Sequence, residues 1–489
     1  MTLTLADLSG CFDGVIPSII ATAAADGKPN ISYLSHVAMV DGERVALSNQ
    51  FFAKTAANIR ANPRARLLLV HARSGRQFAL DLLWESSADR GALFERMARD
   101  LKASSAQIGM GDVMRLRAID IFRVVGIEPC LSASEAAPSE PAPVLLRDVA
   151  PAMSELTAQD SIAALLDALL ASVRRLAACD HALVLLPEPA RAALVTMASV
   201  GYRQSGIGSE VPIREGLIGE AAAGRSTFKI NDASRLQRFS QAIARSEANE
   251  DRTRSIALPS LIGGLSQIAV PMIAQGELRG VLFAESPARL AFDADRQSTL
   301  EMLCQQAASS LALLDATAEE GPMTSLPTAD RPAGVDEPVH VTAYAFDDSV
   351  FIGDTYVIKG VAGRLLVFLL ERSMAEARTE FTNREIRLAS ELKLPEFKDN
   401  LETRLLLLRR RLDEKRLPVR LEQIARGRIR LCVTGRPIIR LRWVQGSKRQ
   451  QVASAPLPDI PSVLESGRCS QDGNRQISIQ LGYLKIGLR

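Results

Sequence analysis

Two proline-rich segments divide this chain of 489 residues and limit the size of each folded part. Residues 132–151 (SASEAAPSEPAPVLLRDVAP) and 317–338 (TAEEGPMTSLPTADRPAGVDEP) are rich in Pro, Ala, Ser and Glu, a composition typical of linkers. The blocks between them have the usual size of single domains. We therefore expect domains at residues 1–130, 152–316 and 339–436, linkers at 131–151 and 317–338, and a basic tail at 437–489.

Positive charge is concentrated at the C-terminal end. Residues 398–489 hold 20 Lys and Arg against 8 Asp and Glu, a local net charge of +12. Because the whole chain carries only +3, the first 397 residues carry −9. A strongly basic end on an otherwise acidic chain predicts a domain that binds a polyanion.

Composition and motifs narrow the class of protein. An apolar content of 47% and a charged fraction of 24% are typical of globular domains and argue against disorder. No run approaches the ~18 apolar residues of a membrane span, and the start does not resemble a secretion signal. Six widely spaced cysteines without a CxxC pair favour neither a disulfide framework nor a zinc module. We therefore expect a cytoplasmic protein without membrane contact or a metal site, and we assign no catalytic residues.

The first block has the short strands and tight turns of a small β-barrel. We expect strands at residues 15–21, 30–40, 44–48 and 65–71, and a helix at 54–61. The run from GVIPSIIATAAADGKPNISYLS to RARLLLV, with GALFERMARDL and IDIFRVVGIEP after it, resembles the split barrel of the pyridoxamine 5'-phosphate oxidase family. That resemblance implies a homodimer with FMN at the seam between the two copies.

The same resemblance implies FMN contacts in the segment SNQFFAKTAANI. It places Lys54 and Thr55 at the phosphate, and Ser48, Asn49 and Gln50 near the ring system. Chemically this is sound, because a lysine ammonium and a hydroxyl both suit a phosphate. The family's oxidases carry an arginine on the second strand where this chain has Ser32, so pyridoxine phosphate is not expected as a substrate. The alternative is a barrel kept as a dimerisation scaffold, with Lys54 merely solvated.

The second block alternates helices and strands in the manner of an α+β sandwich. We expect helices at residues 160–178, 216–224 and 293–316, and strands at 182–187, 192–199, 267–271 and 278–285. The segments GLIGEAAAGRSTFKIND and QIAVPMIAQGELRGVLFAES resemble a GAF domain. The resemblance implies a small-molecule ligand whose identity stays open, since GAF domains bind cyclic nucleotides, tetrapyrroles, small acids or nothing. Its flanking helices suit a helical dimer.

The third block has two short strands, three helices and a hairpin. We expect strands at 339–346 and 351–358, helices at 361–372, 382–392 and 396–415, and a hairpin from 419 to 433. FIGDTYVIKGVAGRLLVFLL, LETRLLLLRRRLDEK and IARGRIRLCV resemble the winged helix-turn-helix effector domains of response regulators. The fold class expected for the whole chain is therefore multidomain α+β, with a split β-barrel, a GAF α/β sandwich and a winged helix-turn-helix.

The third of these helices is the predicted DNA-recognition helix. Its leucines and Phe397 share one face, which we expect to be buried. The opposite stripe would face base edges, which Asn and Arg side chains match well, and it consists of Asn400, Thr403, Arg404, Leu407 and Arg411. The arginines expected at phosphates are Arg409 and Arg410 on the helix and Arg426, Arg428 and Arg430 on the hairpin. The alternative is a basic helix that docks on protein.

Three functions remain open at this point. The first is a one-component cytoplasmic transcription regulator, in which flavin or small-molecule binding is coupled to binding of double-stranded DNA. The second is an FMN-dependent oxidoreductase that its GAF and C-terminal domains regulate. The third is a scaffold whose basic end binds an acidic protein. The basic C-terminal end favours the first.

Overall fold

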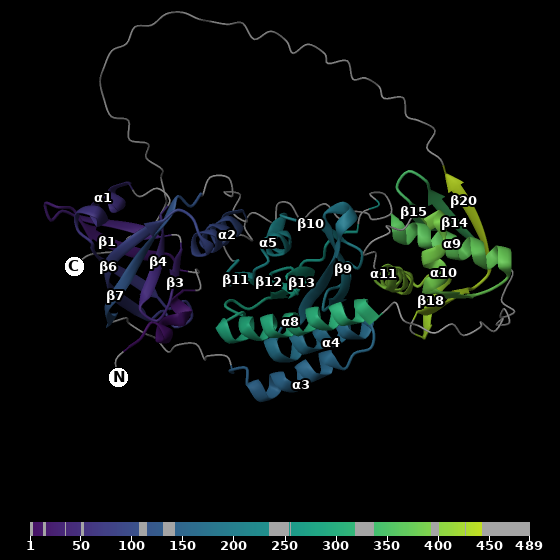
Figure 1. The fold of residues 1–489 in the computed structure, drawn as a ribbon, viewed down its shortest axis with the longest axis horizontal. Helices are drawn as coiled ribbons and strands as arrows, with labels where there is room; N and C mark the ends of the chain where they lie inside the picture. The colour runs from purple at the N-terminus through teal and green to yellow at the C-terminus, as the bar shows by residue number, and fades with distance from the viewer. Residues whose placement is uncertain are drawn as a thin grey trace, which may run out of the picture. The chain divides into compact units, whose positions relative to one another are not determined.

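The computed structural model of the chain describes most of its first 442 residues (Figure 1). The described ranges are 3–12, 16–34, 36–49, 53–106, 115–130, 142–233, 254, 256–317, 337–392, 401–425 and 427–442. In these ranges, no helix is both long and apolar enough to cross a membrane.

The N-terminal part is a curled antiparallel sheet in the order β2-β1-β5-β6-β7-β4-β3. Its elements are the 3-10 helix Ala6–Cys11, β1 (Ser18–Ala23), β2 (Pro29–Leu34), β3 (Val37–Met39), β4 (Arg44–Asn49), α1 (Ala53–Ala61), β5 (Arg64–Val70), β6 (Gln77–Ala88), α2 (Ala92–Ala106) and β7 (Ala118–Cys130). Strands β2 and β3 lie at opposite edges of the sheet, yet only a few residues connect them. The two edges must therefore approach each other, and β2 indeed contacts β4.

Two features of the barrel differ from expectation. The expected single strand at 30–40 is broken into β2 and β3, because the chain passes from one edge of the sheet to the other at this point. The long strand β6 was not expected, and it occupies the centre of the sheet between β5 and β7. Alternate residues of β5, such as Leu67 and Leu69, are buried in the barrel core.

The middle part is an antiparallel sheet in the order β10-β9-β8-β13-β12-β11, with helices on both faces. Its elements are α3 (Leu146–Thr157), α4 (Ile162–Ala177), β8 (His181–Glu188), a 3-10 turn at Pro189–Arg191, β9 (Ala193–Val200), β10 (Glu210–Pro212), α5 (Gly216–Gly224), β11 (Phe228–Ile230), β12 (Ser266–Ala274), β13 (Glu277–Ser286) and α8 (Ala294–Thr317). Figure 1 shows α3, α4 and α8 stacked on one side of this sheet. The other face packs against α5.

Burial on both faces explains the continuous apolar runs in this domain. Along β8, Val184 points to the helical layer and Leu185 to the side of α5. The tight turn between β12 and β13 has positive φ at Gln275 and Gly276, which matches a two-residue hairpin turn. The expected helices and strands of this block are all present, with ends that differ by a few residues.

The expectation that residues 146–151 form part of a linker is wrong. They begin α3, with Pro151 inside the helix, and Val149 and Ala152 are buried in the core cluster of the helical layer. Apolar residues at helical spacing therefore outweigh the hydrogen bond that the proline removes, because packing against α8 stabilises the helix.

The C-terminal part combines two small sheets with a helical core. Strands β14 (Pro338–Tyr344), β15 (Ser349–Ile352), β16 (Thr355–Ile358) and β20 (Arg436–Arg442) form a sheet in the order β16-β15-β14-β20, and β17 (Glu380–Thr382), β18 (Val419–Ala425) and β19 (Arg428–Val433) form another in the order β17-β19-β18. The helices are α9 (Val361–Glu376), α10 (Asn383–Leu388) with a 3-10 turn at Ser390–Leu392, and α11 (Leu401–Glu414).

Three details of this part differ from expectation. The expected strand 351–358 is two strands, β15 and β16, that turn at Gly353. Helix α10 is shorter than expected, and Thr382 caps its start by accepting a hydrogen bond from the Glu385 amide at 3.2 Å. The first residues of the expected tail belong to β20, which pairs in parallel with β14. Phe397 and Asn400 lie outside the described residues.

Candidate functional sites

Thr55 lies at the centre of a small polar cluster where α1 meets β1 and β2. Its hydroxyl oxygen accepts a hydrogen bond from Asn30 Nδ2 at 3.0 Å and lies 2.9 Å from Ser32 Oγ. Thr55 is 5% exposed, while the neighbouring Lys54 is exposed. Asn30 and Ser32 are alternate residues of β2, so both side chains point to the same side of the strand.

These residues fit the phosphate that the barrel's fold family implies. Ser32 and Thr55 have hydroxyl groups, Asn30 has an amide donor, and the exposed Lys54 precedes Thr55 in α1. Each of these groups can donate to phosphate oxygens. Ser32 occupies the strand position where the family's oxidases have an arginine, so here a hydroxyl replaces a charge. Sequence reasoning missed Asn30, although its spacing from Ser32 was a usable signal.

The residues expected near a flavin ring are engaged within the barrel. Ser48 is 2% exposed, and its hydroxyl accepts a hydrogen bond from the His36 amide at 3.1 Å. Asn49 Nδ2 donates to Asp120 Oδ2 at 3.0 Å. Gln50 lies outside the described residues. A direct role of Ser48, Asn49 and Gln50 at the ring stays a prediction.

His36 and Asp100 form a second polar pair in the barrel. Nε2 of His36 lies 3.8 Å from Oδ2 of Asp100, a distance that would suit an ion pair. Burial, with the nearby positive charge of Arg96 adding to it, lowers the pKa of His36 to about 4. Burial also raises the pKa of Asp100 to about 6, against the opposing effect of Arg96 and Arg99. Burial therefore disfavours both charged forms, and the pair is mainly neutral between these two values.

Glu285 is the polar centre of the GAF-like sheet on its α5 side. It is 1% exposed, and its carboxylate accepts hydrogen bonds from the Tyr202 hydroxyl at 2.8 Å, Gln267 Nε2 at 2.8 Å and the Leu261 amide at 3.0 Å. Three donors compensate the buried charge. Sequence reasoning missed Glu285, although an acidic residue that ends an apolar strand run was a usable signal.

Cys179 and His181 lie two residues apart and are residue types that can bind a metal ion, but both side chains have other contacts. The Cys179 thiol donates to the Glu285 carbonyl at 3.0 Å, and burial raises its pKa to about 11, so the thiol form dominates at neutral pH. His181 contacts the Tyr202 ring edge-on at 5.3 Å. In the part of the chain that the structure describes, no group of three or more metal-ligating side chains occurs.

Helix α11 buries its leucines as predicted, but one of its arginines does not face outward as predicted. Leu401, Leu405, Leu408 and Leu412 are buried, as expected. Arg411, which we placed on the outward stripe, is fully buried. Its Nε donates to the Val357 carbonyl at 3.1 Å, and its Nη1 lies 2.9 Å from Glu414 Oε2. The prediction that Arg411 faces DNA bases is therefore wrong, because this side chain ties α11 to β16.

The other predicted arginines of α11 contact the GAF-like domain or the hairpin. Arg404 Nη2 lies 3.1 Å from Glu188 Oε1, and Arg410 Nη2 lies 2.7 Å from Asp167 Oδ1. Arg409 Nη1 donates to Gln423 Oε1 at 3.1 Å. Thr403 is half-buried on the same helix. In this arrangement the guanidinium groups of Arg404 and Arg410 pair with carboxylates of the protein itself.

The hairpin arginines Arg428 and Arg430 share one carboxylate. Their Nη2 atoms lie 3.2 and 2.8 Å from the oxygens of Glu380, the first residue of β17. The hydrogen bond from Arg430 and the charges of both arginines hold the pKa of Glu380 below its usual value. Arg426 lies outside the described residues. Glu380 was missed from the sequence, because its contact with β19 depends on sheet pairing.

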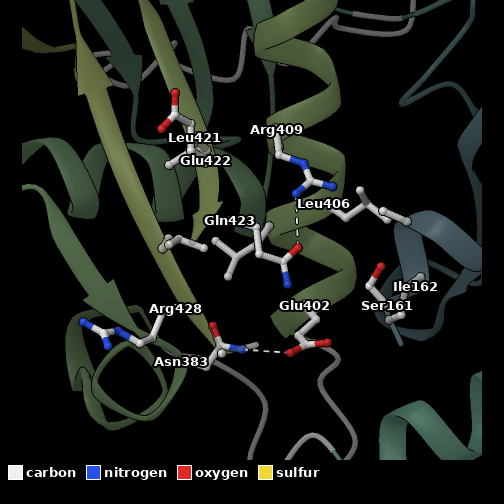
Figure 2. Close-up of a pocket in the computed structure, with 14 residues that line it drawn as sticks. Ser161, Ile162, Asn383, Glu402, Leu406, Arg409, Leu421, Glu422, Gln423 and Arg428 are labelled. Atoms are coloured by element: carbon white, nitrogen blue, oxygen red, sulfur yellow. Dashed lines mark hydrogen bonds between the residues drawn. The ribbon is translucent and has the colours of Figure 1, made fainter. Parts of the chain in front are cut away.

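A small hollow, partly open to solvent, lies between the start of α4 and the face formed by α11, β18 and β19. Figure 2 shows Leu406 of α11 directed toward Ile162 of α4 and the preceding residue Ser161, and Arg409 beside Gln423. Asn383 Nδ2 donates to Glu402 Oε1 at 3.2 Å. Asn383 Oδ1 is buried and has no hydrogen-bond partner among the described residues.

Comparison with known families assigns the first two domains. Residues 14–123 match the model of the pyridoxamine 5'-phosphate oxidase family, and residues 159–312 match the model of the GAF domain. Both assignments confirm the resemblances inferred from the sequence. The two domains indicate a sensory or flavin-related protein. Neither match includes the C-terminal part, and no curated protein matches the chain.

Similar solved structures include single domains of several proteins. The GAF domain of an Acinetobacter phosphoenolpyruvate-protein phosphotransferase is 21% identical, with 35% of this chain and 95% of that chain covered, at a TM-score of 0.29. Free methionine-R-sulfoxide reductase of Neisseria meningitidis, in complex with its substrate, is 19% identical over 37% of this chain and 95% of that chain, at 0.29. An FMN-binding protein of Syntrophomonas wolfei is 15% identical over 26% and 86%, at 0.23.

Proposed function

We propose that this protein is a one-component cytoplasmic regulator whose first two domains sense a small molecule and whose C-terminal domain binds double-stranded DNA. The observation that carries the proposal is the order of elements in the C-terminal domain. Helix α9 is followed by β17, then by α10, α11 and the β18–β19 hairpin. A helix that presents side chains to the major groove, followed by a basic hairpin, is the arrangement expected of a winged helix.

Charge supports the proposal independently of topology. Several arginines of this domain are exposed, and they are Arg384, Arg416, Arg420, Arg436, Arg440 and Arg442. Exposed guanidinium groups suit phosphate contacts, which supply most of the affinity in nonspecific DNA binding. An acidic protein partner would also suit these charges and is therefore an outcome of the test.

FMN is the ligand we propose for the barrel. The family match and the cluster of Lys54, Thr55 and Ser32 support it. When bound, FMN would supply a flavin ring that absorbs light and accepts electrons. The residues of this chain would hold its phosphate. We do not favour an FMN-dependent oxidoreductase, because no feature of the described site favours catalysis over sensing.

The DNA-binding proposal can be tested on the C-terminal domain by itself. The core of this domain is built from its own side chains, so far as the chain is described, and residues 337–442 should therefore fold alone. We expect the segment to bind pooled duplexes, with an affinity that falls as salt rises. Arg420→Ala, which removes an exposed arginine of β18, should weaken specific and random binding alike and reduce the salt slope by about one unit. No binding even at ~50 mM salt would refute the proposal in favour of a protein-binding scaffold.

The flavin proposal needs a separate experiment. We expect the purified full chain to be yellow, and mass spectrometry of the small molecules it releases to identify FMN. A colourless protein that shows no change in FMN fluorescence on titration would refute the cofactor assignment while leaving the DNA-binding proposal intact.

A further inference from the structure

We propose that the GAF domain holds the C-terminal domain in a closed state that excludes DNA, and that carboxylates of the GAF domain occupy the α11 arginines in place of DNA phosphates. This inference rests on the proposed function, and it concerns how the same site is regulated. It is carried by contacts at two separate places on the C-terminal domain, one on α11 and one on the β14–β15 hairpin.

The first place is the charged face of α11. Glu188, at the end of β8, pairs with Arg404, and Asp167 of α4 pairs with Arg410. The two arginine side chains are only 12% and 14% exposed. Arg410 also donates to the Met197 carbonyl at 2.8 Å. A guanidinium fork that is held by a carboxylate and a carbonyl cannot also bind a phosphate or a base edge.

The apolar part of the same face is covered as well. Leu406 is 6% exposed and belongs to the core cluster formed by α3, α4 and α8. Leu407, which we had placed on the DNA-facing stripe, packs against this cluster too. Further along the helix, the Ser205 hydroxyl donates to Glu414 Oε1 at 2.6 Å. A recognition helix needs this face free in order to enter the major groove. The closed state and the DNA-bound state therefore exclude each other.

The second place lies away from α11. Arg254, in the segment that precedes β12, stacks on the Tyr344 ring with 4.0 Å between its guanidinium carbon and the ring centroid. Its Nη1 also lies 3.6 Å from Asp347 Oδ2. Such a cation–π contact beside a carboxylate stabilises a docked arrangement. Because Arg254 belongs to the GAF domain and Tyr344 to β14, this contact holds the two domains together without using any residue of α11.

The consequence is a lowered apparent affinity for DNA. If only a fraction of the molecules is open, the apparent dissociation constant of the whole chain exceeds that of the free domain by the inverse of that fraction. Any substitution that weakens the closed state should therefore raise the affinity of the full chain for DNA. The segment 337–442 gives the limit that a fully open chain would reach.

The first test removes the two GAF carboxylates in the full chain. The double variant Asp167→Asn/Glu188→Gln should bind pooled duplexes several-fold more tightly than the parent, up to the limit of about tenfold that applies if about a tenth of the parent is open. The control Glu215→Gln/Glu277→Gln removes the same charge from exposed GAF positions away from α11. It should bind like the parent. If the control tightens binding as much as the double variant, the effect is one of net charge and the proposal is wrong.

The second test uses Arg254→Gln in the full chain. This variant removes a positive charge, so a purely electrostatic effect would weaken DNA binding. Loss of the docking contact should instead tighten binding several-fold. Unchanged circular dichroism spectra and thermal unfolding would show that the variants fold.

The outcomes separate the two proposals. If the segment 337–442 binds DNA and the parent binds as tightly as the segment and the variants, the closed state is refuted while the DNA-binding function stands. If the segment does not bind DNA even at ~50 mM salt, the proposed function fails and the closed state fails with it. If the segment and the variants bind more tightly than the parent and the control, the proposal is supported.

Discussion

Arg411 carries a positive charge in a place that excludes water, and this fixes its role as a structural one. Its side chain is fully buried among α11, β16 and Gly208 of the GAF domain, and its guanidinium group donates to the Val357 carbonyl and pairs with Glu414. A buried charge is tolerated only when it is paired and hydrogen-bonded. The position of α11 in the C-terminal domain therefore depends on this side chain.

Arg411→Ala should destabilise the C-terminal domain. The substitution leaves a cavity and an unpaired Val357 carbonyl, and together these should lower the free energy of unfolding by about 3 kcal/mol. Urea unfolding of residues 337–442, followed by circular dichroism, measures the change. Arg420→Ala is the matched control, because Arg420 is exposed on β18. Equal midpoints for the two variants would contradict the structural role.

Lys54→Glu should weaken binding of FMN to the barrel. A negative charge beside Thr55 and Ser32 would repel the phosphate and remove a charge-assisted contact, a loss on the order of 1–3 kcal/mol. Quenching of FMN fluorescence during titration gives the dissociation constant. Arg90→Glu makes the same change of charge at another exposed position of this domain and should bind FMN like the parent. If both variants bind equally well, Lys54 is not at the phosphate.

At the scale of elements, the pair formed by Asp100 of α2 and His36, which lies between β2 and β3, changes its protonation with pH. The pKa of His36 is lowered to about 4 from 6.5, so the unfolded chain takes up a proton first and acidification through this range destabilises the fold. The pKa of Asp100 is raised to about 6 from 3.8, so the folded chain takes up a proton first and acidification stabilises it. The two effects oppose each other between about pH 6 and 4.

Substitution of either partner should reveal this opposition. In Asp100→Asn the stabilising effect is absent, so the melting temperature should fall more steeply than in the parent between pH 6.5 and pH 4.5. In His36→Gln the destabilising effect is absent, so the fall should be shallower. All other titrating groups are common to the three proteins. Parallel curves of melting temperature against pH would show that neither group titrates as proposed.

The elements that sequence reasoning predicted are those whose partners lie close along the chain. The GAF strands are apolar runs bounded by turns, such as the hairpin at Gly276, and local pattern suffices for them. Strand β20 is different, because its sequence RPIIRLR, with three arginines in seven residues, resembles a basic tail until β14 provides a distant partner. Likewise Pro151 indicates a linker until α8 provides a surface for α3. Long-range pairing decides these elements, and no local pattern contains it.

The same distinction applies to the candidate sites. Lys54 and Thr55 follow from a motif, and Ser32 joins them because β2 and α1 are neighbours. The partners of the α11 arginines could not be predicted, since Glu188 and Asp167 belong to another domain. Residue type indicated that these arginines bind anions, but only the packing identifies the carboxylates that they contact.

At the scale of the whole molecule, the outer face of β2 presents a surface that a monomer would leave in water. Ile31 and Tyr33 are 70% and 69% exposed on this strand, which is an edge of the barrel sheet. Exposed apolar side chains on an unpaired edge favour association. Asn30 and Ser32, which contact Thr55, alternate with them on the same strand.

We therefore predict that the full chain is a homodimer paired through the barrel, with β2 at or near the seam. Light scattering at micromolar concentration should give twice the 52.9 kDa of one chain. The double variant Ile31→Lys/Tyr33→Lys should shift this mass toward that of one chain, because like charges would face each other across the seam. Met374→Lys places a charge at a half-exposed apolar residue of α9 and should leave the dimer intact. Because the proposed FMN phosphate site lies on the same strand, the variant should also lose affinity for FMN. A parent mass of one chain would refute the dimer, and a dimeric double variant would place the seam elsewhere.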